Sequence, residues 1–176
     1  METKRVVITG AFGTGKTTFV QTASEIDVVT IERPITDQKS TFKETTTVAL
    51  DFGRLVLDSN LDLHLYGTPG QDRFDFMWEI LVHGASAYIV LVAADQPNSF
   101  EQARQIISFM NQQVQVPMMI GLTHMDSPEA LTPQEIMLGL GYQENHPTFV
   151  TVNPRDKAST IEALDVLKNL LTLGND

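Results

Sequence analysis

The sequence contains no cysteine among its 176 residues, so disulfides, thiol nucleophiles and thiolate metal sites are excluded. Apolar runs are short, the longest lying near residues 88–94, and none approaches the length that spans a membrane. Basic residues are also few. Against 22 Asp and Glu there are 12 Lys and Arg, a formal net charge of −10. This balance argues against a nucleic-acid-binding surface.

We also expect no targeting or anchoring signal. Residues 2–5 are polar and run directly into an apolar segment, so we expect no signal peptide. Position 2 is Glu2 and no Cys stands at the C-terminus, so we expect none of the common lipid anchors. We expect a cytoplasmic protein with no membrane anchor of its own, which a partner could recruit to the inner membrane face. With 42% apolar and 19% charged residues, residues 1–176 are expected to form a single globular domain.

Strand-like and helix-like segments alternate along the chain. Strands are predicted at 5–9, 45–57, 61–66, 86–93, 117–122 and 148–152. The turn Asp58-Ser59-Asn60 joins the second and third of these into an antiparallel hairpin. Residues 26–32 are either a further short strand or an extended connection. Residues 33–44, which are polar and contain Pro34, are interpreted as a mobile loop.

Helices are predicted to begin near residues 16, 74, 100, 133 and 158. Asn98-Ser99-Phe100-Glu101 has the spacing of a capping box, and Thr132-Pro133-Gln134-Glu135 places Pro in a first turn. The alternation predicts an α/β fold: a mostly parallel six-stranded sheet with one antiparallel hairpin strand and helices on both faces. Ligands of such sheets bind beyond the carboxyl ends of the strands, so the loops there should meet around one pocket.

A phosphate-binding loop lies between the first predicted strand and helix. Gly10-Ala11-Phe12-Gly13-Thr14-Gly15-Lys16-Thr17 fits the pattern G-x-x-x-x-G-K-[ST]. Its glycines let the backbone approach a polyphosphate, and its N–H groups and the following helix start attract anions. Lys16 would reach the β- and γ-phosphates, and Thr17 would give its hydroxyl to Mg²⁺. The residues assigned to nucleotide here are Gly10, Phe12, Gly13, Thr14, Gly15, Lys16, Thr17 and Thr18.

Two later segments add candidates for the γ-phosphate end. A hydroxyl from Thr45-Thr46-Thr47 could complete the Mg²⁺ shell, although the preference of Thr for strands also explains this run. In the stretch 67–74, the Gly70 N–H could sense a γ-phosphate and Gln71 could orient an attacking water. The alternative for that stretch is an ordinary strand-to-helix turn.

Two more loops suggest a base-binding end. Thr123-His124-Met125-Asp126 follows a buried strand, and a carboxylate at Asp126 could accept from N1–H and the exocyclic amine of guanine. Adenine offers no such donor pair, so this contact would discriminate between the bases. An Asp after a strand can also simply cap a helix. Asn153-Pro154-Arg155 could border the base.

In this order the motifs resemble those of small Ras-like GTPases over nearly the whole chain. Residues 47–52, Thr-Val-Ala-Leu-Asp-Phe, resemble the Thr-x-Gly-x-Asp-Phe of the first switch in Rab-type members, which selects Thr47 as the second metal ligand. Residues 67–74 resemble the second switch, Asp-Thr-Ala-Gly-Gln-Glu-Arg-Phe. Residues 123–126 resemble the base-reading Asn/Thr-Lys-x-Asp, and residues 153–155 stand where the family has Ser-Ala-Lys.

Several positions depart from that family. Gly67 replaces the Asp that holds Mg²⁺ through water, Pro69 replaces Ala, and Phe12 replaces a Gly beside the γ-phosphate. His124 replaces a Lys whose stem packs on the base. The Pro-Gly-Gln form is similar to the bacterial and archaeal branch around the gliding-polarity GTPase. Phe12, the Thr-rich segment and residues 51–55, Asp-Phe-Gly-Arg-Leu, resemble the prokaryotic "ATP/GTP-binding protein" set encoded near roadblock-domain proteins. That resemblance implies a roadblock-type regulatory protein as partner.

The resemblance implies a small GTP-binding protein that switches between GTP and GDP states and hydrolyses GTP slowly with Mg²⁺. Gln71 and Lys16 would be catalytic, and segments 33–47 and 67–82 would change between states. Phe12 should hinder an arginine finger from outside, and Arg54 and Arg73 are candidates for an internal one. Two alternatives remain open: a non-catalytic nucleotide-binding scaffold subunit, and a P-loop ATPase or phosphotransferase.

Overall fold

The computed structural model describes residues 1–36, 45–68 and 84–174. The helix predicted at 74–82 lies outside these ranges, as do Gly70, Gln71 and Arg73 of the predicted second switch. The side chains of residues 32–36 and 45–49 are likewise outside the description, although their backbone is within it.

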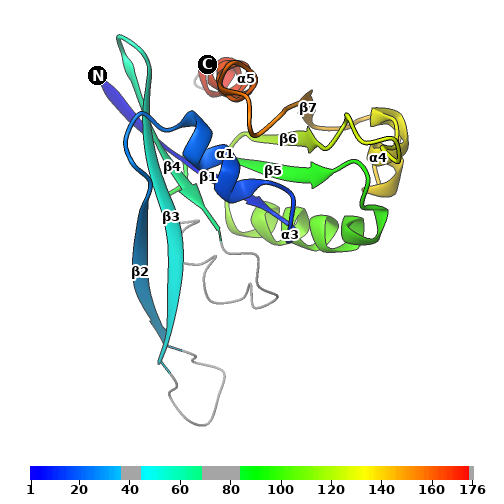
Figure 1. Ribbon diagram of the computed structural model, residues 1–176, viewed down its shortest axis with the longest axis horizontal. Helices are drawn as coiled ribbons and strands as arrows, with labels where there is room; N and C mark the ends of the chain where they lie inside the picture. Colours follow the sequence, from blue (N-terminus) through cyan, green and yellow to red (C-terminus); the bar gives the residue numbers. More distant parts are fainter. Residues whose placement is uncertain (37–44, 69–83, 175–176) are drawn as a thin grey trace.

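One mixed sheet of seven strands runs through the molecule in the order β2-β3-β4-β1-β5-β6-β7 (Figure 1). The strands are β1 (Glu2–Gly10), β2 (Val29–Thr36), β3 (Thr45–Asp58), β4 (Leu61–Gly67), β5 (Ala87–Ala93), β6 (Met118–Thr123) and β7 (Thr148–Thr151). β3 is antiparallel to both of its neighbours, and the other pairs are parallel. The predicted α/β class and the single antiparallel hairpin strand are confirmed.

The prediction of six strands is wrong by one, because residues 29–36 form β2. Pro34 lies within it, opposite Thr47 of β3. Proline has no N–H to donate, so it is tolerated in a strand only where one side needs no partner. β2 is the edge of the sheet and satisfies this condition. Arg33–Thr36 are therefore strand rather than the predicted mobile loop, whose remainder, 37–44, is outside the described residues.

β2 and β3 extend beyond the rest of the sheet as a long two-stranded ribbon (Figure 1). The ladder between β3 and β4 ends at the pair Asp51 and Gly67, whereas the ladder between β2 and β3 continues to Thr36 and Thr45. Residues 45–50 of β3 thus pair with β2 alone in the described structure. We call residues 31–36 and 45–50 the ribbon.

Helices cover both faces of the sheet, as predicted (Figure 1). α1 (Lys16–Ala23) and α5 (Lys157–Leu173) pack on one face through buried residues such as Phe19 and Leu164. α3 (Phe100–Gln113) and α4 (Pro133–Gly139) pack on the other, where Met110 and Ile136 are fully buried. No helix in the described part of the chain is both long and apolar enough to cross a bilayer.

The two predicted helix starts have different outcomes. At α4, the Thr132 hydroxyl accepts from Glu135 N at 3.2 Å and Thr132 N donates to Glu135 Oε1 at 3.3 Å, a complete capping box. At α3, the Ser99 hydroxyl instead donates to the Gln96 carbonyl at 2.7 Å. The predicted capping box from Asn98 to Glu101 is wrong, because Asn98 lies within a 3₁₀ turn, η1 (Pro97–Ser99), and α3 begins only after Ser99, whose φ and ψ are helical whereas a capping residue is extended.

Candidate nucleotide site

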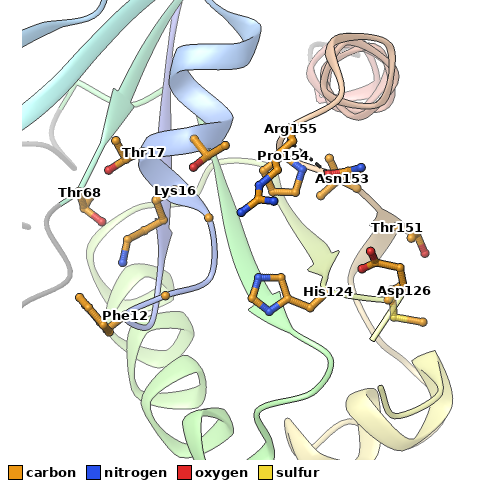
Figure 2. A pocket seen from close by; sticks show the side chains of 15 residues that line it. Phe12, Lys16, Thr17, Thr68, His124, Asp126, Thr151, Asn153, Pro154 and Arg155 are labelled. Carbon is orange, nitrogen blue, oxygen red and sulfur yellow. Dashed lines mark hydrogen bonds between the residues drawn. The ribbon is translucent and has the colours of Figure 1, made fainter. Parts of the chain in front are cut away.

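A cavity of about 670 Å³ opens at the carboxyl ends of β1, β6 and β7 (Figure 2). The loop before α1 and the segments after β6 and β7 build its wall, with one residue from the end of β4. The lining residues are Phe12, Gly13, Gly15, Lys16, Thr17, Thr18, Thr68, His124, Met125, Asp126, Thr151, Val152, Asn153, Pro154 and Arg155. The structure thus brings the predicted phosphate loop and both predicted base-side loops to one place.

The loop before α1 has a conformation that requires glycine. Gly13 and Gly15 have φ angles of 77° and 102°, in the left-handed region that favours glycine. A Cβ on Gly15 would also lie 2.8 Å from Cγ of Pro154. The phosphate loop and the loop after β7 therefore touch at Gly15, which leaves no space for a larger residue.

Lys16 lies at the bottom of this loop and is only 6% exposed. Its ammonium donates to the carbonyl of Gly10, and to that of Ala11 at 3.1 Å. Burial lowers its pKa from 10.5 to about 8. A cation that is largely removed from water and held by neutral carbonyls gains from a nearby anion, so this position is suited to a phosphate group.

Oxygen donors gather beside Lys16. The Thr17 hydroxyl donates to a carboxylate oxygen of Asp51 at 2.8 Å. The Thr68 hydroxyl is buried, has no hydrogen-bond partner within the described ranges, and lies on the Lys16 side of its residue (Figure 2). Hydroxyl and carboxylate oxygens are the donors that Mg²⁺ prefers, so the residues present fit this ion. The described residues hold no cluster of three His, Asp or Glu, so bound phosphates would supply further ligands.

Thr47, the other predicted metal ligand, is in the ribbon, where its backbone lies opposite Pro34. Its side chain is outside the description, so its role stays a prediction. The catalytic assignment of Gln71 and the γ-phosphate contact of Gly70 also stay predictions, since both residues lie outside the described ranges.

The far end of the cavity carries the predicted base-side residues. The Asp126 carboxylate lies between His124 and Thr151, and the Arg155 guanidinium points into the cavity (Figure 2). Asn153 accepts a hydrogen bond from the Arg155 N–H at 3.1 Å, an Asx turn that shapes this loop. Pro154 is buried against Gly15. Carboxylate, guanidinium and peptide groups at this end can recognise a polar heterocycle.

His124 is held in a strained backbone conformation. Its φ is 57°, and it is the one non-glycine residue with positive φ in the described structure. Its Nδ1 lies 3.0 Å from a carboxylate oxygen of Asp95. Partial burial alone would raise the pKa of Asp95, but hydrogen bonds from His124 and Ser127 lower it below the ordinary value. The contact fixes the imidazole ring at the rim of the cavity.

Three residues assigned to nucleotide from the sequence are not on the cavity wall: Gly10, Thr14 and Thr123. The Thr123 side chain is fully buried, and its hydroxyl donates to the Thr14 carbonyl at 2.9 Å. The Thr14 hydroxyl in turn donates to the Ala11 carbonyl at 2.9 Å. The side chains of these two threonines support the loop from behind.

Arg54, one candidate for an internal arginine finger, lies away from the cavity. It is opposite His64 in the β3–β4 ladder and binds the Asp62 carboxylate through Nε and Nη2, each at 2.9 Å. The hydrogen bond to Asp62 raises the pKa of Arg54 and lowers that of Asp62. The hypothesis of an Arg54 finger is therefore wrong for this structure, and Arg73 is outside the described residues.

Four lining residues were not predicted: Thr68, Met125, Thr151 and Val152. Each follows or ends a strand whose carboxyl end faces the cavity, and the backbone position rather than the side-chain type places it there. The rule that ligands bind beyond the carboxyl ends of strands could have identified them.

The fold is that of a small GTPase. The structure resembles that of the Arl6/BBS3 small GTPase from Trypanosoma brucei, solved with the nucleotide analogue GppNp, with a TM-score of 0.72 and 17% identity over 97% of this chain and 98% of that one. The model of the family described as "Conserved hypothetical ATP binding protein" matches residues 26–169, and the chain belongs to this family.

Two curated proteins are similar in sequence. The uncharacterized protein MJ1339 of Methanocaldococcus jannaschii is 34% identical over 92 residues, which cover 52% of each chain, so the match spans about half the length of that relative. Mouse Ras-related protein Rab-7b is 23% identical over 172 residues, covering 93% of this chain and 79% of its own.

Proposed function

We propose that this protein binds a guanine nucleotide with Mg²⁺ and acts as a molecular switch that hydrolyses GTP slowly. The observation that carries the proposal is the single cavity that joins the phosphate loop, at Lys16 and Thr17, to the carboxylate of Asp126. Its two ends suit the two ends of a nucleotide. The small-GTPase fold and the Rab relative support the same class.

A second candidate is an ATP-binding protein, favoured by the description of the family to which the chain belongs. Guanine is preferred here because a carboxylate accepts hydrogen bonds and guanine offers N–H donors on the edge where adenine offers an acceptor at N1. Competition of GTP and ATP against a fluorescent nucleotide at equal Mg²⁺ decides between them. If ATP bound more tightly, the guanine assignment would be overturned.

Asp126→Asn sharpens this test. An amide donates as well as accepts, so GTP affinity should fall at least about tenfold while xanthosine nucleotides, which carry a carbonyl in place of the amine, should gain. Glu129→Gln is the matched control, because Glu129 is exposed nearby and does not line the cavity. Equal losses in both variants would refute a direct role for Asp126.

Hydrolysis is assigned to water positioned by Gln71, with Lys16 and the loop N–H groups stabilising charge on the phosphates. Segments 33–47 and 67–82 are proposed to change between the GTP and GDP states. Gln71→Leu should bind nucleotide normally and lose most single-turnover hydrolysis. If hydrolysis in this variant equalled that of the wild type, Gln71 would not be the positioning residue.

A roadblock-type protein is proposed as regulator, and through it recruitment from the cytoplasm to the inner membrane face. Phe12, 78% exposed at the mouth of the cavity, favours a partner that does not insert an arginine beside it. Single-turnover hydrolysis with and without such a partner tests this. No hydrolysis in either case, with nucleotide tightly bound, would favour the scaffold alternative.

A further inference from the structure

A carboxylate from β3 holds the hydroxyl of Thr17. Thr17 Oγ1 donates a hydrogen bond of 2.8 Å to Oδ2 of Asp51, across 34 positions of sequence. A hydroxyl has one proton and two acceptor lone pairs. Because the proton is committed to Asp51, the lone pairs of Thr17 remain free for a cation, and the charged acceptor strengthens the bond that fixes them.

The position of the Asp51 carboxylate depends on residue 67 being a glycine, which has no side chain. Asp51 and Gly67 lie opposite each other in the β3–β4 ladder. A Cβ on Gly67 would lie 3.3 Å from Cβ of Asp51 and 3.6 Å from its Oδ2. Gly67 does not have a positive φ, so its backbone conformation would accept other residues. A side chain at position 67 would be tight against Val20, whose Cγ2 would lie 3.2 Å from its Cβ, and against Asp51, whose carboxylate lies beside that position.

A second oxygen stands beside this pair. Thr68 directly follows Gly67, and its buried hydroxyl, which lines the cavity, has no partner in the described part of the chain. Such a group is satisfied by a ligand or a water, since an unpaired buried hydroxyl is costly. The Asp51–Thr17 pair and the Thr68 hydroxyl thus lie where the cavity would receive the phosphates and their cation.

We propose that Asp51 is the acidic positioning residue for Mg²⁺, and that it fills from β3 the place that a side chain at position 67 would otherwise occupy. It orients the Thr17 hydroxyl as a ligand and adds negative charge near the cation. The inference rests on the proposed function, because it requires a nucleotide with Mg²⁺ in the cavity.

Release of a fluorescent guanine nucleotide, measured with Mg²⁺ and with EDTA, tests the proposal without depending on hydrolysis. In the wild type, Mg²⁺ should slow release. In Asp51→Asn, which keeps the size of the side chain, release with Mg²⁺ should be about tenfold faster, while release in EDTA should not change. Asp58→Asn is the control, since Asp58 is on the same strand but pairs with Lys168.

Exchange of the two residues provides a second test. Gly67→Asp alone should weaken Mg²⁺ retention, because its new side chain crowds and repels Asp51. Combining Asp51→Gly with Gly67→Asp should restore much of the Mg²⁺ effect that Asp51→Gly loses, a non-additive result. The proposal is overturned if Asp51→Asn keeps the full Mg²⁺ effect, or if the exchange restores nothing.

The same measurements distinguish failure of the proposed function from failure of the role proposed for Asp51. If the wild type bound no guanine nucleotide, or if Mg²⁺ did not slow its release, the proposed function would fail. If the wild type showed the Mg²⁺ effect and Asp51→Asn showed it equally, only the role of Asp51 would fail. Thermal unfolding of each variant without nucleotide establishes that it is folded.

Discussion

The hydroxyl of Thr123 donates a 2.9 Å hydrogen bond to the carbonyl of Thr14, joining the end of β6 to the phosphate loop across 109 positions of sequence. Both residues are buried, with exposed fractions of 0% and 1%. The bond therefore fixes the loop against the sheet from a side that a ligand does not reach.

Replacing Thr123 with Val should destabilise the protein by about 1–3 kcal/mol, because it leaves the buried Thr14 carbonyl without this donor. Thr9→Val is the matched control. Thr9 is also fully buried, but its hydroxyl has no partner among the described residues, so its loss should be close to neutral. Urea unfolding of the two variants measures the difference. Equal destabilisation would show that the Thr123 bond contributes nothing specific.

Gly15→Ala should be more damaging than Gly13→Ala. Both positions have positive φ, a strain of about 1–2 kcal/mol for alanine. At Gly15 the new Cβ also meets Pro154, whereas at Gly13 it meets nothing within 4 Å. Gly15→Ala should therefore lose both stability and nucleotide affinity. The comparison uses chemical unfolding without nucleotide and equilibrium nucleotide titration. Similar losses in both variants would mean that the Pro154 contact relaxes without cost.

Nucleotide affinity should fall above pH 8, by roughly tenfold per pH unit, because burial lowers the pKa of Lys16 to about 8 and only the protonated form attracts phosphate. The stability of the free protein should change in the opposite direction. Between pH 8 and 10.5 the unfolded chain keeps a proton at Lys16 that the folded chain has lost, so this residue contributes increasing stability as pH rises.

Lys16→Met is the control for both pH profiles. It should bind nucleotide weakly, and the slopes assigned to Lys16 in affinity and in stability should disappear. Titrations and urea unfolding across pH 7–10 measure them. Persistence of both slopes in Lys16→Met would assign them to another group.

Arg54→Gln should lower stability at neutral pH and weaken the loss of stability that acid causes through Asp62, without changing GTP hydrolysis. The hydrogen bond from Arg54 lowers the pKa of Asp62, so the pair contributes stability above the ordinary carboxyl pKa and loses it as pH falls through the lowered value. The variant should lose this contribution at neutral pH, by a small amount because Arg54 is exposed. A large fall in single-turnover hydrolysis would instead revive Arg54 as an arginine finger.

The phosphate loop could be predicted from sequence because its requirements are local. Gly13 and Gly15 need positive φ, and Lys16 follows them at the start of a helix. Strand β2 could not be predicted with equal clarity, because Pro34 and the polar residues around it match a loop. Only the position of β2 at the edge of the sheet, a property of the whole fold, permits proline there.

No short sequence pattern predicts the contact between Thr17 and Asp51 either. The sequence reveals that position 67 lacks a carboxylate, but the compensation depends on the strand register that places Asp51 opposite Gly67. The same dependence on context explains the helix starts. Asn98 and Thr132 each stand three residues before a Glu, but Asn98 lies within a 3₁₀ turn, and only Thr132, with its extended backbone, caps its helix.

The free energy of local unfolding should be lower for the ribbon than for the central strands of the sheet. Residues 45–50 pair with β2 alone, whereas Asp51 and Phe52 pair with both β2 and β4. Amide hydrogens of the ribbon should exchange with solvent through local unzipping, while those of β1 and β5 should exchange only when the whole protein unfolds. Because Asp51 stands at this boundary, the ribbon could separate without loss of the contact between Asp51 and Thr17.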